Sequence, residues 1–108
     1  MHKIIATLVW ILLTVPSVTA ADFEKGLEAF NRDDFATALQ EWRQLAEQGD
    51  AAAQSNLGVM YEKGKGVEKD HKQAFYWYKK AAEQGYDVAQ YNLGFLYYNG
   101  KGVEQDYK

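Results

Sequence analysis

Apolar side chains recur along the chain at the spacing of one helix face. Ala53, Leu57 and Tyr61 follow one another at intervals of four residues, which places them on a single stripe of an α-helix. A second stripe alternates small and large side chains, as in helices that interlock. Its members are Ala74, Tyr78, Ala81 and Ala82. The pattern therefore predicts a pair of helices that pack face to face.

Capping residues mark where these helices begin and end. Asp70 is a good N-cap for the second helix, and Gln73 three residues later completes a capping-box pattern. Gly85 predicts the end of that helix, because glycine readily takes the positive φ of the C′ position. Gly49 stands at the same place one unit earlier.

The segment Gly64-Lys65-Gly66 lies between the two helices, where a glycine-rich loop could also cradle a phosphate. No β-rich run precedes it, and no Lys-Ser or Lys-Thr pair follows its glycines, so the context of a P-loop is absent. We interpret the segment as the inter-helix connection. Gly64 ends the first helix, Gly66 permits the turn, and Val67 tucks under the hairpin.

The whole pattern repeats with a period of 36 residues. Segments 46–72 and 82–108 are identical at 17 of 27 aligned positions, and a period in this range predicts a stacked array of repeats. Gly58, within the first stripe, recurs as Gly94. A glycine inside a helix costs about 1 kcal/mol relative to alanine, so we expect both to lie at close helix crossings. A weaker copy places Asp34, Ala38, Trp42 and Ala46 36 residues before Asp70, Ala74, Tyr78 and Ala82.

These residues resemble the Sel-1-like repeat, a relative of the tetratricopeptide repeat with a longer loop between its helices. The residues that match the repeat pattern are Ala53, Gln54, Leu57, Gly58, Tyr61, Gly64, Gly66, Val67, Asp70, Ala74, Trp77, Tyr78, Ala81, Ala82 and Gly85. The first unit departs from the pattern, because Gly26 and Ala38 are 12 residues apart where Gly58 and Ala74 are 16 apart. It is more similar to an ordinary tetratricopeptide unit.

The resemblance implies an all-α fold, a right-handed α-solenoid of antiparallel helix pairs. We divide the chain into a signal peptide at residues 1–20, a tetratricopeptide-like unit at 21–49, a Sel-1-like repeat at 50–85 and an incomplete repeat at 86–108. The second helix of that last unit is missing, so a helix from about Val88 to Tyr98 would leave Leu93, Leu96 and Tyr97 partly bare. We therefore expect the native gene to continue beyond Lys108.

The first 20 residues have the layout of a secretory signal peptide. Lys3 precedes a 12-residue apolar run, and the small residues Val18 and Ala20 stand at −3 and −1 of a cut before Ala21. The run is shorter than the roughly 20 residues that span a bilayer. We expect an exported protein, periplasmic or secreted and bacterial in origin, with no membrane insertion after cleavage.

The composition of the mature chain offers little catalytic chemistry. Without residues 1–20 it has 11 Lys or Arg against 15 Asp or Glu, a net charge of −4, so we expect no nucleic-acid partner. It contains no Cys and keeps one histidine, His71, and one serine, Ser55. Zinc sites and serine nucleophiles need more partners than these. We therefore expect no enzyme activity, no metal and no cofactor, and we read Ser55 and His71 as variable surface positions.

A scaffold of this kind binds a protein or peptide partner along its concave side, and the resemblance implies such an adaptor role. In related repeats the first helix of each pair lines the groove. Aromatic side chains are frequent anchors of binding sites, although a stripe of them can equally be core. In the run Phe75 to Tyr78 we expect Tyr76 to be the exposed member. The candidate groove residues are Phe23, Leu27, Phe30, Ser55, Val59, Glu62, Tyr91, Phe95 and Tyr98.

Two other functional classes remain open. Some cysteine-rich relatives are associated with β-lactam binding or hydrolysis, but those use disulfide-linked repeats, and this chain has no Cys. The other class is a passive structural spacer that binds nothing tightly.

Overall fold

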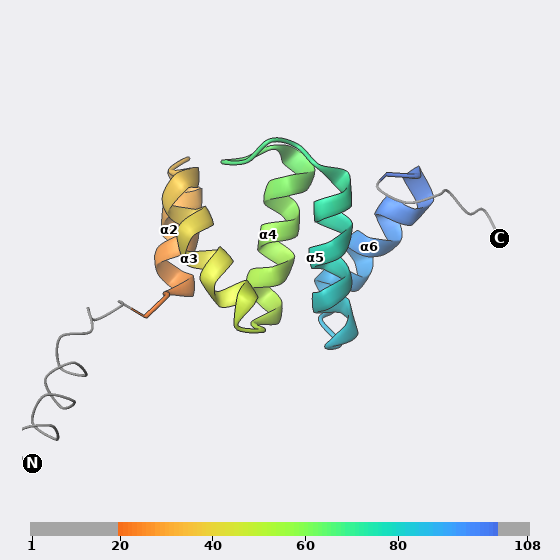
Figure 1. Ribbon diagram of the computed structural model, residues 1–108, viewed down its shortest axis with the longest axis horizontal. Coiled ribbons are helices and arrows are strands. Elements are labelled where there is room, and N and C mark those ends of the chain that lie inside the picture. The colour runs from red at the N-terminus through yellow and green to blue at the C-terminus, as the bar shows by residue number, and fades with distance from the viewer. Residues whose placement is uncertain (1–19, 102–108) are drawn as a thin grey trace, which may run out of the picture.

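The computed structural model describes residues 20–101, which form five helices and no strand. Neighbouring helices pack in chain order along the long axis of the molecule (Figure 1). This arrangement confirms the predicted all-α helical-repeat solenoid. The predicted signal peptide, apart from Ala20, and the end of the chain after residue 101 lie outside the described residues. The helices are α2 (Phe23–Asn31), α3 (Phe35–Glu47), α4 (Ala51–Lys63), α5 (His71–Glu83) and α6 (Asp87–Asn99).

Aspartate side chains cap four of the five helices. Asp50 accepts a hydrogen bond from the Ala53 amide at 2.9 Å, and Asp70 accepts from Lys72 and Gln73 at 3.0 and 3.2 Å. Asp22 and Asp34 do the same for α2 and α3. The helix α6 follows Tyr86 and has no side-chain cap.

The predicted capping box at Asp70 is only half formed. The Asp70 amide donates to the Tyr61 carbonyl at 2.9 Å, so the end of α4 already supplies the acceptor that the Gln73 side chain was expected to provide. This bond ties the end of the inter-helix loop to α4. The prediction of Asp70 as the N-cap is confirmed, and that of a reciprocal bond from Gln73 is wrong.

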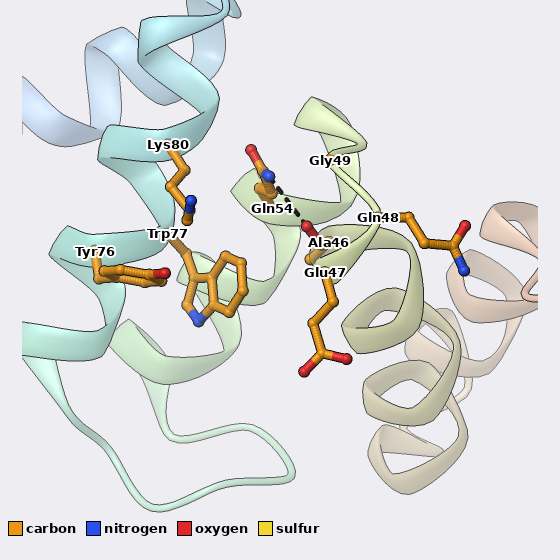
Figure 2. Close-up of a pocket in the computed structure, with 8 residues that line it drawn as sticks. All are labelled: Ala46, Glu47, Gln48, Gly49, Gln54, Tyr76, Trp77 and Lys80. Atoms are coloured by element: carbon orange, nitrogen blue, oxygen red, sulfur yellow. Dashed lines mark hydrogen bonds between the residues drawn. The ribbon is translucent and has the colours of Figure 1, made fainter.

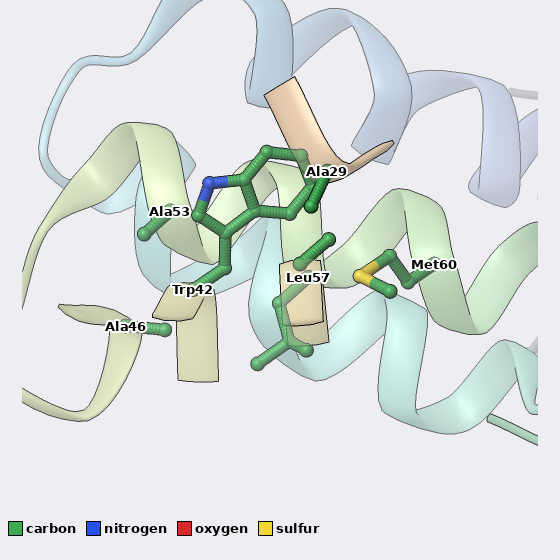
Figure 3. Packing of buried hydrophobic residues seen from close by; sticks show 7 residues of the cluster. Ala29, Trp42, Ala46, Ala53, Leu57 and Met60 are labelled. Carbon is green, nitrogen blue, oxygen red and sulfur yellow. The ribbon is translucent and has the colours of Figure 1, made fainter. Parts of the chain in front are cut away.

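The core lies where α2, α3 and α4 meet. Trp42 fills its centre, and its indole Nε1 donates to the Phe23 carbonyl at 3.2 Å. Val67, from the inter-helix loop and predicted to tuck under the hairpin, packs against this cluster. A smaller cluster of Ala74, Tyr78 and Leu96 joins α5 to α6. The main cluster consists of Ala29, Ala38, Trp42, Ala46, Ala53, Leu57 and Met60 (Figure 3).

Two helical glycines lie directly beneath aromatic rings. A Cβ on Gly58 would lie 2.6 Å from the Tyr78 ring, and one on Gly26 would lie 2.5 Å from Nε1 of Trp42. The close crossing predicted at Gly58 is confirmed. No such crossing is present at Gly94 within residues 20–101, where no atom would lie within 4 Å of a Cβ on it. No described helix follows α6 to supply the ring.

The Gly-Lys-Gly loop contacts the preceding unit. Gly64 takes the left-handed conformation at the end of α4, and Gly66 has a φ of 73°. A Cβ on Gly66 would lie 3.0 Å from the Phe35 side chain, and Lys65 Nζ lies 5.2 Å from the centre of the Phe35 ring. Figure 1 shows the loop extending back toward the α2–α3 side before it enters α5. Gly64 ends α4 and Gly66 takes a positive φ in the connection, as predicted, and the structure adds a contact of the loop with the preceding unit.

Glutamines of the repeated Ala-Gln motif tie each first helix to the helix before it. Gln54 Nε2 donates to the Ala46 carbonyl at 3.0 Å, and the equivalent Gln90 donates to the Ala82 carbonyl at 3.2 Å. Both carbonyls belong to the last turn of a helix, where backbone acceptors lack intrahelical partners. The repeated glutamine thus satisfies a helix end.

Candidate functional site

Six of the nine candidate residues line two adjoining hollows on one surface. The first hollow, about 180 Å³, lies between α2 and α4 and includes Leu27, Phe30 and Val59 in its lining. The second, about 210 Å³, lies between α4 and α6 and includes Val59 again. We call this surface the first-helix groove. Its candidate residues are Leu27, Phe30, Val59, Glu62, Tyr91 and Phe95.

The other three candidates lie elsewhere. Phe23 packs on Trp42, with ring centres 5.8 Å apart, so it supports the core. Tyr98 is exposed but lines neither hollow. Ser55 is only 1% exposed, and its prediction as a surface position is wrong. The reason is that α4 packs against α3 on one side and α5 on the other, so less of its circumference is open than on α6.

The lining of the groove changes from its first hollow to its second. The first contains no charged side chain and is lined mainly by the apolar side chains of Leu27, Phe30 and Trp42. Its polar lining residues are Asn31 and Asn56. The second adds Glu62 and Lys63. A ligand that spans both hollows would meet an apolar site followed by a mixed one.

Glu62 is held in place by Tyr78. The Tyr78 hydroxyl donates to Glu62 Oε1 at 2.7 Å. Burial, with the hydrogen bond to Glu62 and its negative charge, raises the pKa of Tyr78 far above its ordinary value. The phenol therefore stays protonated and remains a donor, so the groove keeps a fixed carboxylate beside Val59.

Asn56 and Asn92 hold equivalent positions in the two repeats and were not among the predicted site residues. Asn56 lines the first hollow and Asn92 the second. Both are half-buried, and neither side-chain amide makes a hydrogen bond within residues 20–101. The sequence carried one signal for them, because asparagine recurs at this position beside the packing stripe in both units.

A third hollow, of about 430 Å³, lies between the end of α3 and the middle of α5. Figure 2 shows Tyr76 and Trp77 on one side of it and Glu47 on the other, with the Gln54–Ala46 hydrogen bond between them. Tyr76 is exposed, as predicted, and meets the Trp77 ring edge-on at 5.0 Å. Most of its lining residues either carry polar side chains or belong to the α3–α4 turn.

The serine and the acidic side chains of residues 20–101 are not brought together with His71 in a nucleophilic or metal-binding arrangement. Ser55 Oγ is buried and finds no hydrogen-bond partner there, so it forms no pair with His71. Within residues 20–101 no group of three or more His, Asp and Glu side chains is placed to hold a metal ion. None of the helices in the same range has the length and apolar character needed to cross a bilayer.

Comparisons with known proteins agree with this geometry. Comparison with curated proteins found no match. Among solved structures, a protective antigen of uropathogenic Escherichia coli with an SLR fold is 46% identical, with a TM-score of 0.72 over 76% of this chain. A Sel1 repeat protein from Oxalobacter formigenes is 38% identical, with a TM-score of 0.73 over 82% of this chain. The chain spans 18% and 35% of the lengths of these two proteins.

The family match covers the helices that build most of the groove. The family model for the Sel1 repeat matches residues 51–86 and 87–108, which include α4, α5 and α6. The match coincides with the segments whose glycines, aspartate cap and glutamines have the structural roles described above. The chain therefore belongs to the Sel1 repeat family.

Proposed function

We propose that this protein is an interaction scaffold that binds an extended peptide segment of a partner in the first-helix groove. Sel1 repeats are generally protein–protein interaction modules. The observation that carries the proposal is that two hollows, lined mainly by first helices, share Val59 as a common wall. Solenoids of helix pairs typically present extended binding surfaces of this kind.

The size of the hollows favours side chains over a whole small molecule. Each hollow is about 180–210 Å³, below the roughly 300–1,000 Å³ of typical small-molecule pockets. Tyr91 and Phe95 remain 75% and 43% exposed beside the second hollow, and exposed aromatic rings are frequent interface anchors. The proposed ligand therefore places one apolar side chain on each side of Val59.

The two asparagines supply the polar half of the recognition. An extended peptide carries backbone N–H and C=O groups that lose water on binding and need new partners. The side-chain amides of Asn56 and Asn92 each offer a hydrogen-bond donor and an acceptor. No side chain or backbone group of the described residues forms a hydrogen bond with them. They are spaced one repeat apart along the groove, so they can hold successive stretches of the same backbone.

Selection of displayed peptides on the purified chain, followed by calorimetry, tests this proposal. We expect selected peptides to carry two apolar residues and to bind at least ten-fold more weakly to Val59→Glu. Val88→Glu is the control for introducing the same charge on an exposed position of α6 that lines neither hollow, and circular dichroism of both variants shows that the half-buried Val59 position still folds as glutamate. Failure to select any peptide would favour the spacer, and turnover of nitrocefin by the chain would favour the hydrolase.

We also propose that the protein is exported. The basis is the layout of residues 1–20, which lie almost wholly outside the described part of the chain. Both similar structures come from bacteria, and in a bacterium an exported chain would reach the periplasm or the exterior. Mass spectrometry of protein recovered from the producing cells tests this proposal, and we expect the mature chain to begin at Ala21. An intact Met1 on folded protein would contradict it.

A further inference from the structure

Glu41 is a buried carboxylate in the first unit of the solenoid. It lies on α3 and is only 7% exposed. One period later the equivalent position is Trp77, an aromatic residue that packs against the main cluster. A charged side chain therefore stands where the next unit has an apolar one. Burial of a charge is unfavourable unless a partner compensates it.

The partners of Glu41 within residues 20–101 compensate its charge incompletely. Its Oε1 accepts a hydrogen bond from the Asp22 amide at 2.9 Å, and that donor is neutral. Its Oε2 lies 3.9 Å from Lys25 Nζ, which is a long ion pair, and the Lys25 side chain is 59% exposed. A carboxylate can accept more hydrogen bonds than this one does, so the described surroundings of Glu41 lack a close cation.

The chain enters α2 directly beside this carboxylate. Asp22 caps α2, and its own amide is the donor to Glu41. Ala21 is half-buried, and its amide donates no hydrogen bond to any atom of residues 20–101. Consecutive backbone nitrogens are less than about 4 Å apart. The Ala21 nitrogen is therefore held close to Glu41 by the bond that its neighbour makes.

Cleavage before Ala21 would change the charge at this point. Hydrolysis of the Ala20–Ala21 peptide bond by a peptidase consumes one water and leaves a carboxylate on Ala20 and an amine on Ala21. A free α-amino group is largely protonated at neutral pH, and its three N–H groups can turn toward an acceptor. A neutral amide without a described partner is thereby replaced by a cation next to a buried carboxylate.

We infer, on the basis of the proposed export, that Glu41 binds the α-ammonium group of Ala21, so that removal of the signal peptide stabilises the first unit. The ammonium donates to Oε2, while the Asp22 amide keeps Oε1. The pair joins the start of α2 to the middle of α3, the two helices of that unit. The uncleaved chain has no charged nitrogen at this position, so its first unit is less stable than that of the mature chain.

Thermal unfolding of two forms of the mature chain tests this pairing. One begins at Ala21 with a free amine, released from a removable N-terminal fusion, and the other is identical except that this amine is acetylated. We expect acetylation to lower Tm by at least about 4 °C, a shift typical of one lost contact in a domain of this size. The sign is informative, because a cation at a helix N-terminus is otherwise unfavourable.

Two substitutions assign the effect to one carboxylate. Glu41→Gln keeps an oxygen for the Asp22 amide but removes the charge, so acetylation should then leave Tm unchanged or raise it. Glu24→Gln is the matched control, because Glu24 is an exposed carboxylate in the first turn of α2. In that variant acetylation should still lower Tm as it does in the parent chain.

The outcomes separate this pairing from the export proposal. Equal Tm values for the two forms of the parent chain would overturn the pairing. An equal loss in the parent chain and in Glu41→Gln would assign the effect to the bulk of the acetyl group, and a loss that Glu24→Gln also removes would assign it to the general field of α2. Both results contradict the pairing. The N-terminus is defined in every sample, so an intact Met1 on protein from cells would contradict export alone.

Discussion

The helices α4 and α6 have closely similar sequences and different surroundings. Each carries the Asn-Leu-Gly motif, with Leu57 and Gly58 on α4 and Leu93 and Gly94 on α6. Leu57 and Gly58 are buried, whereas Leu93 is half-buried and Gly94 is exposed. The difference arises because α4 packs between α3 and α5, while α6 packs on α5. The glycine is thus required for packing on α4, whereas on α6 no described neighbour requires it.

The largest expected effect on stability comes from replacing the glycine of α4, compared with the same replacement on α6. Gly58→Leu should lower the free energy of unfolding by about 3 kcal/mol, the upper part of the range for overpacking, because its side chain must displace the Tyr78 ring. Gly94→Leu should leave it unchanged or raise it by up to about 1 kcal/mol through better helix propensity. Urea unfolding followed at 222 nm measures both. Equal losses would mean that α6 is covered on this face in solution.

The next effect concerns the hydrogen bond that fixes α5 on α4. Tyr78→Phe removes the donor to Glu62, and a bond to a charged acceptor contributes about 1.5–3 kcal/mol. We expect a loss near the lower limit, about 1.5 kcal/mol at pH 7, because Glu62 is only half-buried. Tyr91→Phe on the open helix α6 is the control and should change stability by less than about 0.5 kcal/mol, as a surface substitution. A similar loss in both variants would contradict the assignment.

The same tyrosine predicts a pH dependence. The pKa of Tyr78 in the folded chain lies above its ordinary value, so above a pH of about 10 the unfolded chain releases a proton that the folded chain keeps. Stability from this group is full below pH 10 and is lost as the pH rises further. We expect the stability difference between the parent chain and Tyr78→Phe to shrink from pH 8 to pH 11, as measured by urea unfolding. A constant difference would show that Tyr78 titrates alike in both states.

A smaller effect on stability concerns the N-terminal caps of α4 and α6. Asp50→Ala removes the cap of α4 and should cost about 1 kcal/mol. The helix α6 begins after Tyr86 without a side-chain cap, so Tyr86→Asp is the converse test. It should slow hydrogen exchange of the amides at residues 88–90 by a few fold. Unchanged exchange there would mean that the first turn of α6 does not limit its local stability.

The smallest effect concerns the lysine of the Gly-Lys-Gly loop. Lys65 lies over the half-buried Phe35 ring at 5.2 Å, and the equivalent Lys101 lies over the more exposed Phe95 ring at 5.9 Å. Cation–π contacts at exposed sites contribute about 0.5–1 kcal/mol. We therefore expect losses of about 0.5 kcal/mol for Lys65→Ala and less for Lys101→Ala in thermal melts. Loss of anion binding with Lys65→Ala would revive the phosphate-loop interpretation.

The caps and ends of the helices and the type of inter-helix loop could be predicted from short stretches of the sequence. Asp70 caps α5, Gly64 and Gly85 end their helices with positive φ, and Val67 of the loop packs against the main cluster. Each of these features depends on a few neighbouring residues, and each recurs one period away. The repeat itself supplied the evidence that they belong to packing and not to phosphate binding.

The candidate groove was predicted less completely. Val59 and Glu62 line the second hollow, but Ser55, close to both on α4, is buried. Leu96 was expected on a bare face, yet it packs against Ala74 and Tyr78, while Tyr97 on the same helix stays 42% exposed. Helical spacing identifies which residues share one face of a helix. It does not say how much of the helix surface the adjacent helices bury.

The sequence by itself determined the repeat, the helix ends, the loop type and the family, because capping, glycine conformation and periodicity are local or act between equivalent positions. Only the tertiary structure decided which glycine is covered, which aromatic ring is exposed and where two hollows join at Val59. Those properties depend on which helix lies beside which. Identical residues on α4 and α6 acquire different roles because, within residues 20–101, α4 packs between two helices and α6 packs mainly on α5.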